Sequence, residues 1–179
     1  MKRVTLHDKT FCTYIPNEQI EQDIQAVADR LNKDLADVEH PIFVCVLKGS
    51  FMFYASLMQK LTIQPEIEFI RLSSYSGTQS CGEVKQVMGL NRDLKGKTVV
   101  IVEDIVDTGN TIVKLHELFR CQEVADIRIC TLVMKPDVYD KPLKIDYCAR
   151  EIENRFIVGF GLDYDQLGRE LKDIYILES

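Results

Sequence analysis

Carboxylates and a small polar turn stand together near the middle of the chain. The stretch VVIVEDIVDTGNTI, residues 99–112, runs from an apolar segment into Glu103, Asp104 and Asp107, and a Thr-Gly-Asn-Thr turn follows at 108–111. Glycine permits close backbone approach, threonine hydroxyls donate hydrogen bonds, and the free N–H groups of a helix's first turn bind anions. The turn therefore predicts a phosphate site, although helix capping by Asp107 or Thr108 would explain the turn alone equally well. It is not a Walker P-loop, because G-x-x-x-x-G-K-[ST] is absent.

Glu103 and Asp104 strengthen the phosphate interpretation. Adjacent acids that end a buried strand cost solvation energy and gain nothing by packing. They are useful where a ligand donates hydrogen bonds or carries positive charge, as sugar hydroxyls, a hydrated Mg²⁺ or a developing oxocarbenium ion do. A ribose 5′-phosphate satisfies the whole segment, with its phosphate on the turn, its diol on the acids, and a metal between the diol and a pyrophosphate.

The surrounding pattern predicts elements that would place these residues at one edge of a sheet. Apolar residues at helical spacing predict a helix over 17–39 with Asn17 as its N-cap, and strand and helix then alternate through the centre of the chain. This alternation predicts an α/β class with a mainly parallel sheet. We expect strands at 42–47, 66–72, 97–104, 126–134, 144–152, 156–164 and 173–179, helices at 51–61 and 110–120, and a long loop at 73–83.

Polar clusters lie at or just after the carboxyl ends of the predicted strands. Parallel sheets bind ligands at these ends. These clusters are Lys48-Gly49, Glu103-Asp104, Lys135-Pro136 and the segment around Asp163. Since these ends meet at one edge of the sheet, we expect the clusters to form one site.

Size and composition restrict the class of protein. The 179 residues fit one domain, residues 1–179. A net charge of −6 repels nucleic acid, so a polyanionic ligand must be held by local donors or a metal. No signal peptide and no apolar run of roughly 18 residues is present, so we expect a soluble, cytoplasmic protein with no membrane contact. The six cysteines include no C-x-x-C pair, which favours buried reduced thiols over zinc or disulfides.

Five blocks of the sequence resemble one enzyme family. VVIVEDIVDTGNT resembles the signature of the purine and pyrimidine phosphoribosyltransferases, which bind phosphoribosyl pyrophosphate (PRPP). VCVLKGSFMF resembles the pyrophosphate loop of the hypoxanthine-guanine members, and RLSSYSG their mobile catalytic loop. LVMKP and RFIVGFGLDYDQLGREL resemble their base-binding strand and hood segment. The blocks stand in the family's order over residues 42–178. They imply the type I phosphoribosyltransferase fold, a central mainly parallel sheet flanked by helices with a small hood formed by N- and C-terminal segments.

The resemblance assigns roles at the PRPP site. Asp107 would be the catalytic general base near N7 of the purine, and Lys48-Gly49 would bind pyrophosphate after a Leu47–Lys48 peptide that can be cis in this family. Asn110 stands where similar enzymes often carry Lys or Arg, so backbone amides must contribute more to phosphate binding. Glu103, Asp104 and Asp163 would hold the metal. The PRPP and nucleotide set would be Lys48, Gly49, Glu103, Asp104, Asp107, Thr108, Gly109, Asn110, Thr111 and Arg169.

The resemblance also assigns the purine site. Lys135 would donate to O6, and an ammonium can only donate, so it accepts a 6-oxopurine and rejects the amino group of adenine. Phe156 would stack on the base, the Ile157 backbone would meet its Watson–Crick side, and Asp163 would lie close by. Ser74 and Tyr75 would belong to the mobile loop that closes over the site.

The expected function is purine salvage. The enzyme, a pentosyltransferase, would transfer 5-phosphoribosyl from PRPP to N9 of hypoxanthine, with guanine as a second expected substrate, giving IMP or GMP and pyrophosphate with Mg²⁺ as cofactor. We expect a homodimer or homotetramer. The alternatives are a xanthine-preferring phosphoribosyltransferase, and an RNA-binding regulator on the same fold, which the net charge disfavours.

Overall fold

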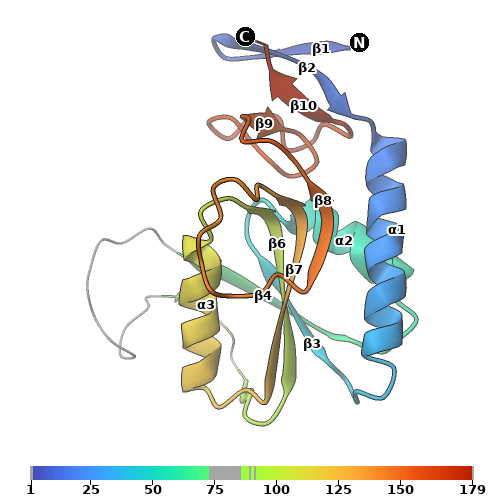
Figure 1. The fold of residues 1–179 in the computed structure, drawn as a ribbon, viewed down its shortest axis with the longest axis vertical. Coiled ribbons are helices and arrows are strands. Elements are labelled where there is room, and N and C mark those ends of the chain that lie inside the picture. Colours follow the sequence, from blue (N-terminus) through green and yellow to red (C-terminus); the bar gives the residue numbers. More distant parts are fainter. Residues whose placement is uncertain (1, 73–85, 89, 91, 179) are drawn as a thin grey trace.

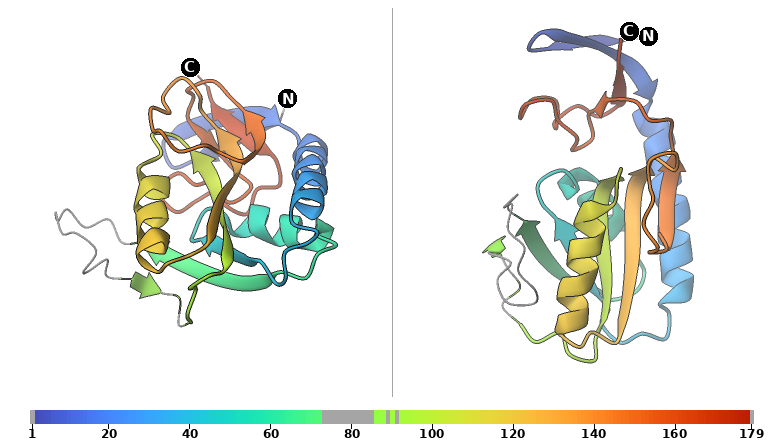
Figure 2. Two further views of the ribbon diagram at one scale, coloured as in Figure 1. Left: turned by 60° about the horizontal axis from the view of Figure 1, so that its bottom comes forward. Right: turned by 60° about the vertical axis from the view of Figure 1, so that its left-hand side comes forward.

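A six-stranded sheet and a separate four-stranded sheet make up the fold in the computed structural model, which describes residues 2–72, 86–88, 90 and 92–178 (Figure 1). The larger sheet forms the body of the molecule. The smaller sheet lies beyond one end of the body and contains both ends of the chain, which lie close together (Figures 1 and 2). The predicted α/β body with a hood of N- and C-terminal segments is thereby confirmed.

The larger sheet has the order β5-β4-β3-β6-β7-β8, and its neighbours are parallel except for the antiparallel pair β4 and β5. Strands β3 and β6 are neighbours in the sheet. After β3 the chain adds β4 on one side of this pair, and after β6 it adds β7 on the other side. Such a switch point is where open parallel sheets bind ligands. The strands are β3 (Ile42–Val46), β4 (Glu66–Leu72), β5 (Gln86–Met88), β6 (Thr98–Val106), β7 (Asp126–Met134) and β8 (Tyr147–Glu151).

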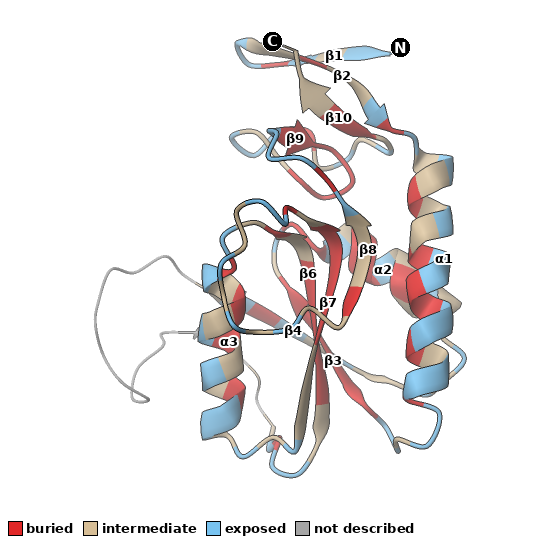
Figure 3. Cartoon of the chain, in the orientation of Figure 1, coloured by how far each residue is buried: buried red, intermediate tan, exposed pale blue. Residues whose placement is uncertain are grey.

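Helices cover both faces of this sheet (Figure 2). Helices α1 (Asn17–Asp34) and α2 (Phe51–Lys60) pack on one face, and α3 (Asn110–Cys121) packs on the other. Each helix has one buried stripe that faces the sheet, and Figure 3 shows this stripe for α1 and α3. In α1 this stripe contains Ile20, Ile24, Val27 and Leu31, each at most 2% exposed. Burying one such side chain stabilises a fold by about 1.5–3 kcal/mol, so this stripe is what attaches α1 to the sheet.

The predicted N-cap of α1 is wrong. Asn17 is the first residue of the helix, Pro16 stands at the cap, and no side chain of the cap makes a hydrogen bond there. Instead, the carboxylate of Asp173 accepts the Asn17 N–H at 2.9 Å, and the Asn17 side-chain amide donates to the Lys172 carbonyl. The helix start is therefore satisfied by the far end of the chain, which no local pattern reveals.

The hood sheet has the order β1-β2-β10-β9 and is antiparallel throughout. Its strands are β1 (Arg3–Leu6), β2 (Lys9–Ile15), β9 (Ile157–Val158) and β10 (Ile174–Leu177). A small core of Leu6, Phe11, Val158 and Tyr175 holds it together. Strands β1 and β2 were not predicted from the sequence, because RVTL alternates polar and apolar residues over only four positions and KTFCTYI does not alternate strictly.

Several predicted boundaries need correction. The strand expected at 156–164 has only two residues, since Gly159, Phe160 and Gly161 all have positive φ and lead the chain out of the sheet. Strand β6 runs on to Val106, so Glu103 and Asp104 lie within the strand rather than at its end. Helix α1 ends at Asp34, not at 39, and β8 begins at Tyr147, not at 144. The loop predicted at 73–83 lies outside the described residues.

The cysteines match their prediction only in part. Cys45 and Cys130 are buried free thiols, Cys12 and Cys148 are partly buried free thiols, and Cys121 is exposed. Cys81 lies outside the described residues. Within the described part of the chain, no helix combines the length and apolar character that a membrane crossing requires.

Candidate functional site

The expected site residues meet at the carboxyl ends of β3, β6 and β7. Lys48 and Gly49 follow β3, Asp107 follows β6, and Lys135 follows β7. Because these strands are parallel neighbours, their ends come together at the edge that faces the hood. The body of the fold thus assembles three separate sequence motifs into one region.

Glu103 and Asp104 are the unusual charges of β6. Glu103 is 8% exposed, and its Oε2 atom has no hydrogen-bond partner among the described residues. Burial, and then the neighbouring Asp104, raise the pKa of Glu103 well above its usual range. Burial also raises the pKa of Asp104 to about 6. A hydrogen bond that the Asp104 carboxylate accepts from the Ile105 N–H at 2.9 Å has the opposite, smaller effect. A buried acceptor without a donor costs free energy, so these acids fit a ligand that supplies donors or positive charge.

The Lys48-Gly49 turn lies directly against Asp104. A Cβ atom at Gly49 would stand 1.6 Å from Asp104 Oδ2, so only glycine allows this contact. The Leu47–Lys48 peptide is cis, in agreement with the family feature. The Lys48 ammonium is exposed and donates to the Gln166 side chain at 3.0 Å, and the Gly49 carbonyl packs against Gly161. The turn is thereby joined to the hood segment that begins at Gly161.

Arg169 and Asp163 are paired within that hood segment. Arg169 Nη2 lies 2.7 Å from Asp163 Oδ1, and Arg169 Nη1 donates to the Gly161 carbonyl at 2.7 Å. The second Asp163 oxygen accepts the Gln166 N–H at 2.8 Å. Gly161, whose carbonyl Arg169 binds, packs in turn against the Gly49 carbonyl. Arg169 is thus held close to the Lys48-Gly49 turn that was expected to bind pyrophosphate.

The 108–111 turn leads directly into α3. Gly109 stands at the N-cap with φ +77, and no side chain of the cap makes a hydrogen bond to the first turn in the described structure. The capping explanation for Asp107 or Thr108 is therefore wrong. Thr108 and Asn110 are exposed. A helix start that no side chain caps in the described structure, and that has no acidic residue in its first turn, is suited to an anion.

Asp107 and Lys135 form an ion pair at the centre of the site. Lys135 Nζ donates to Asp107 Oδ2 at 3.1 Å, with the lysine side chain 8% exposed and the aspartate 46% exposed. Lys135 is therefore a buried lysine and not a solvated surface lysine. An ammonium has three donors, so this one can hold the carboxylate and still donate to a ligand.

Phe156 is supported on one side and open on another. Its ring is 43% exposed and lies 5.9 Å from the Phe11 ring and 5.8 Å from the Tyr164 ring. Asp8 accepts a hydrogen bond from the Tyr164 hydroxyl at 2.7 Å, and Lys9 Nζ lies 5.0 Å from the Tyr164 ring. The sequence did not indicate that the β1–β2 turn supports Phe156, because these residues are far apart in the chain. The adjacent Ile157 is buried in β9, and Ser74 and Tyr75 lie outside the described residues.

The donor set fits a divalent metal that arrives with a substrate. Glu103 and Asp104 offer carboxylate oxygens, the ligands that Mg²⁺ prefers, and one buried oxygen has no partner in the described structure. No cluster of three or more His, Cys, Asp or Glu residues suited to a metal occurs among the described residues. Both carboxylate oxygens of Asp163 already have partners, one in the ion pair with Arg169 and the other in a hydrogen bond from the Gln166 N–H. Mg²⁺ commonly takes one or two carboxylates together with water and substrate phosphates, which agrees with this arrangement.

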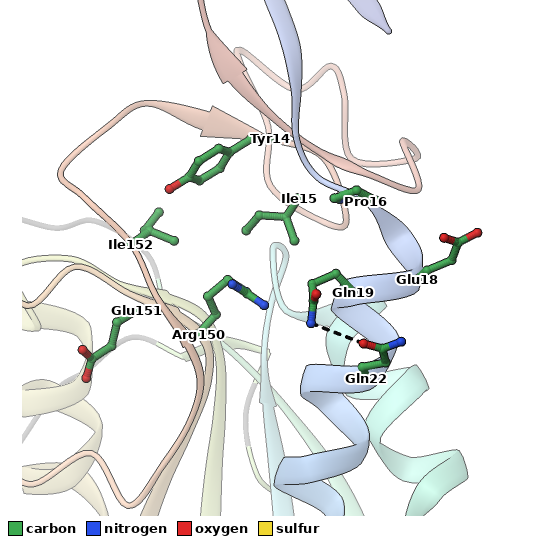
Figure 4. A pocket seen from close by; sticks show the side chains of 9 residues that line it. All are labelled: Tyr14, Ile15, Pro16, Glu18, Gln19, Gln22, Arg150, Glu151 and Ile152. Carbon is green, nitrogen blue, oxygen red and sulfur yellow. Dashed lines mark hydrogen bonds between the residues drawn. The ribbon is translucent and has the colours of Figure 1, made fainter. Parts of the chain in front are cut away.

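A cavity of about 450 Å³ lies elsewhere, between the hood, α1 and the end of β8 (Figure 4). None of the expected site residues lines it. Its basic residue, Arg150, is bound to Asp23 through two nitrogens at 2.6 and 3.0 Å. The cavity is therefore separate from the polar site described above.

Known proteins resemble this chain along most of its length. The phosphoribosyl transferase domain family matches residues 13–165. The hypoxanthine-guanine phosphoribosyltransferase of Streptococcus thermophilus is 37% identical over 163 residues, 90% of each chain. That of Streptococcus pyogenes is 37% identical over 175 residues, covering 89% of this chain and 97% of the relative.

Solved structures of phosphoribosyltransferases have a similar fold. A hypoxanthine-guanine phosphoribosyltransferase of Bacillus anthracis, with a HEPES molecule in its active site, superposes with a TM-score of 0.84 at 32% identity, covering 94% of this chain and 97% of that one. The hypoxanthine phosphoribosyltransferase of Trypanosoma cruzi in complex with the product IMP gives 0.82 at 32% identity, covering 93% and 89%.

Proposed function

Because the chain belongs to the phosphoribosyltransferase family, we propose that it transfers the 5-phosphoribosyl group of PRPP to N9 of hypoxanthine and guanine. The products are IMP or GMP and pyrophosphate, and the role is purine salvage. One observation carries this proposal: Glu103 and Asp104 of β6, with one Glu103 oxygen unpartnered among the described residues, lie shortly before a helix start that no side chain caps in the described structure. That segment can bind a ribose diol and its 5′-phosphate together.

Asp107 is the general base in this proposal. As N9 forms its bond to C1′ and the bond from C1′ to pyrophosphate breaks, the purine loses its N7 proton, which the Asp107 carboxylate accepts. Lys135, 3.1 Å from Asp107 Oδ2, stabilises the ionised carboxylate and orients it. Since the ribosyl group carries positive charge in this reaction, the carboxylates of β6 also stabilise it electrostatically.

Lys135 and Phe156 select the base. The Lys135 ammonium donates to a 6-oxo group and cannot accept from the amino group of adenine. The open side of the Phe156 ring stacks on the purine, and the Ile157 backbone meets its Watson–Crick side. Hypoxanthine and guanine share the 6-oxo group, so both are accepted.

The pyrophosphate of PRPP lies between the Lys48-Gly49 turn and Arg169. Arg169 presents a planar set of donors suited to phosphate oxygens. Mg²⁺ is the metal we propose for Glu103 and Asp104, and when bound it neutralises charge on the pyrophosphate. Asp163 would reach this metal through its waters while remaining paired with Arg169.

We also propose that the protein assembles as a homodimer or homotetramer. Ile67 and Phe69 of β4 are 51% and 43% exposed and point to the same side of their strand. Phe69 lies beside Tyr54 of α2, with the ring centroids 5.6 Å apart. Exposed apolar side chains grouped in this way are typical of a protein interface. Light scattering of the purified protein, with Phe69→Glu as the disrupting variant, tests this proposal.

One assay tests the reaction. The protein is incubated with PRPP and Mg²⁺ and with each of hypoxanthine, guanine, xanthine and adenine, and nucleotide is measured by chromatography. We expect IMP and GMP, no AMP, and no product in EDTA. No nucleotide from any purine would refute the function, and xanthine as the best substrate would favour the xanthine-preferring alternative.

A further inference from the structure

The loop between β7 and β8 contacts residues 107–111, the segment that contains the expected phosphate-binding turn, at two positions. Lys135, its first residue, binds Asp107. Four residues later, the Tyr139 ring covers Gly109, because a Cβ atom there would stand 2.4 Å from Tyr139 Cε2 and 2.9 Å from Cδ2. The ring thus fills the space that a side chain at position 109 would otherwise take.

Tyr139 is itself fixed at both ends. Its hydroxyl donates to the Leu143 carbonyl at 2.5 Å, and its backbone N–H donates to the Lys135 carbonyl at 3.3 Å. The ring also packs against the core beneath α3. It therefore forms a rigid support on one side of the turn. On the other side, Thr108 and Asn110 are exposed to solvent, whereas Gly109 is buried.

The turn needs such a support because of its own sequence. Gly109 has φ +77, a conformation that glycine adopts readily but does not hold by itself. Asn110 has no positive charge, so phosphate binding depends on the amides of this turn. Amides bind an anion best when their directions are set before it arrives.

We propose that Tyr139 is a positioning residue for the 5′-phosphate, with its ring holding Gly109 and the α3 amides in their binding directions. This inference rests on the proposed function. It assigns the ring to phosphate affinity and not to purine affinity, although Lys135 begins the same loop.

The test compares Tyr139→Ala and Tyr139→Leu with Tyr139→Phe as the matched control. Phenylalanine keeps the ring over Gly109 and loses only the hydroxyl contact with Leu143. Leucine keeps apolar volume in the core if the alanine variant is unstable. The dissociation constants of IMP and inosine are measured by calorimetry or competition, since these ligands differ only in the phosphate.

We expect Tyr139→Ala and Tyr139→Leu to weaken IMP about tenfold, roughly 1.4 kcal/mol, with inosine unchanged and the KM of PRPP raised more than that of hypoxanthine. Tyr139→Phe should bind IMP within about twofold of the wild type. IMP affinity that is unchanged in the leucine variant, or an equal loss for IMP and inosine, overturns the inference. A wild-type protein that binds neither IMP nor PRPP refutes the proposed function instead.

Discussion

Replacing Asp104 by asparagine should stabilise the metal-free protein and impair its chemistry. Burial raises the pKa of Asp104 from an ordinary value of 3.8 to about 6, so ionising this carboxyl in the fold is unfavourable. Asparagine has the same shape and can still accept the Ile105 N–H, but it carries no charge. The substitution therefore removes the unfavourable charge and leaves the packing against Gly49 in place.

The magnitude follows from the shift in pKa. Well below pH 3.8 Asp104 is protonated in both the folded and unfolded states, and the shift has no effect on stability. Between pH 4 and 6 the unfolded state releases its proton first, so the fold loses stability as the pH rises. At about 1.4 kcal/mol for each pKa unit, the loss is roughly 1 kcal/mol at pH 4.5 and up to about 3 kcal/mol at pH 8.

Urea denaturation in EDTA at both pH values, at one protein concentration, measures this effect. We expect Asp104→Asn to exceed the wild type by more at pH 8 than at pH 4.5, and to bind PRPP in Mg²⁺ at least about tenfold more weakly. Asp37→Asn, an exposed carboxylate near the start of β3, should show no such pH-dependent difference. A stability gain that is absent at pH 8, or equal at both pH values, refutes the reasoning.

Substitutions at three further residues test the other roles. Asp107→Asn should lower kcat by on the order of 10²-fold or more with little change in the KM of PRPP, measured by steady-state kinetics, and full activity would remove Asp107 as the base. Lys135→Gln should raise the KM of hypoxanthine roughly tenfold and narrow its preference over adenine, which competition between the two purines measures; an unchanged preference would contradict the O6 assignment. Tyr164→Leu should raise the KM of hypoxanthine about fivefold by freeing Phe156, while Tyr164→Phe stays within about twofold; equal effects of the two would show that the ring contact is unimportant.

The sequence predicted the body of the fold well because its signals there are local. The predicted bounds of β7, 126–134, and of β4, 66–72, agree with the observed ones. Strand β7 has a mainly apolar run that is typical of a buried parallel strand, whereas apolar residues alternate with charged ones in β4. The hood was predicted only in outline. Its strands are short, and β9 ends after two residues because positive φ values, one of them at Phe160, turn the chain away.

The site was predicted as a set of motifs, and the structure added the contacts between them. Residue types and order indicated which groups could bind a phosphorylated sugar. They did not indicate that Lys135 reaches Asp107, that Tyr139 covers Gly109, or that the β1–β2 turn supports Phe156 through Tyr164. Each of these contacts joins segments from different parts of the chain.

The sequence by itself determined the chemistry available: acids at a buried strand, glycine and threonine before a helix, and a lysine and an aromatic residue after later strands. Those properties belong to residue types and to short-range backbone preferences. Tertiary structure alone decided which of these groups touch, how far each is from water, and hence that the pKa values of Glu103 and Asp104 are raised. Burial and proximity arise only when parallel strands bring their carboxyl ends to one edge, and no single stretch of sequence encodes that meeting.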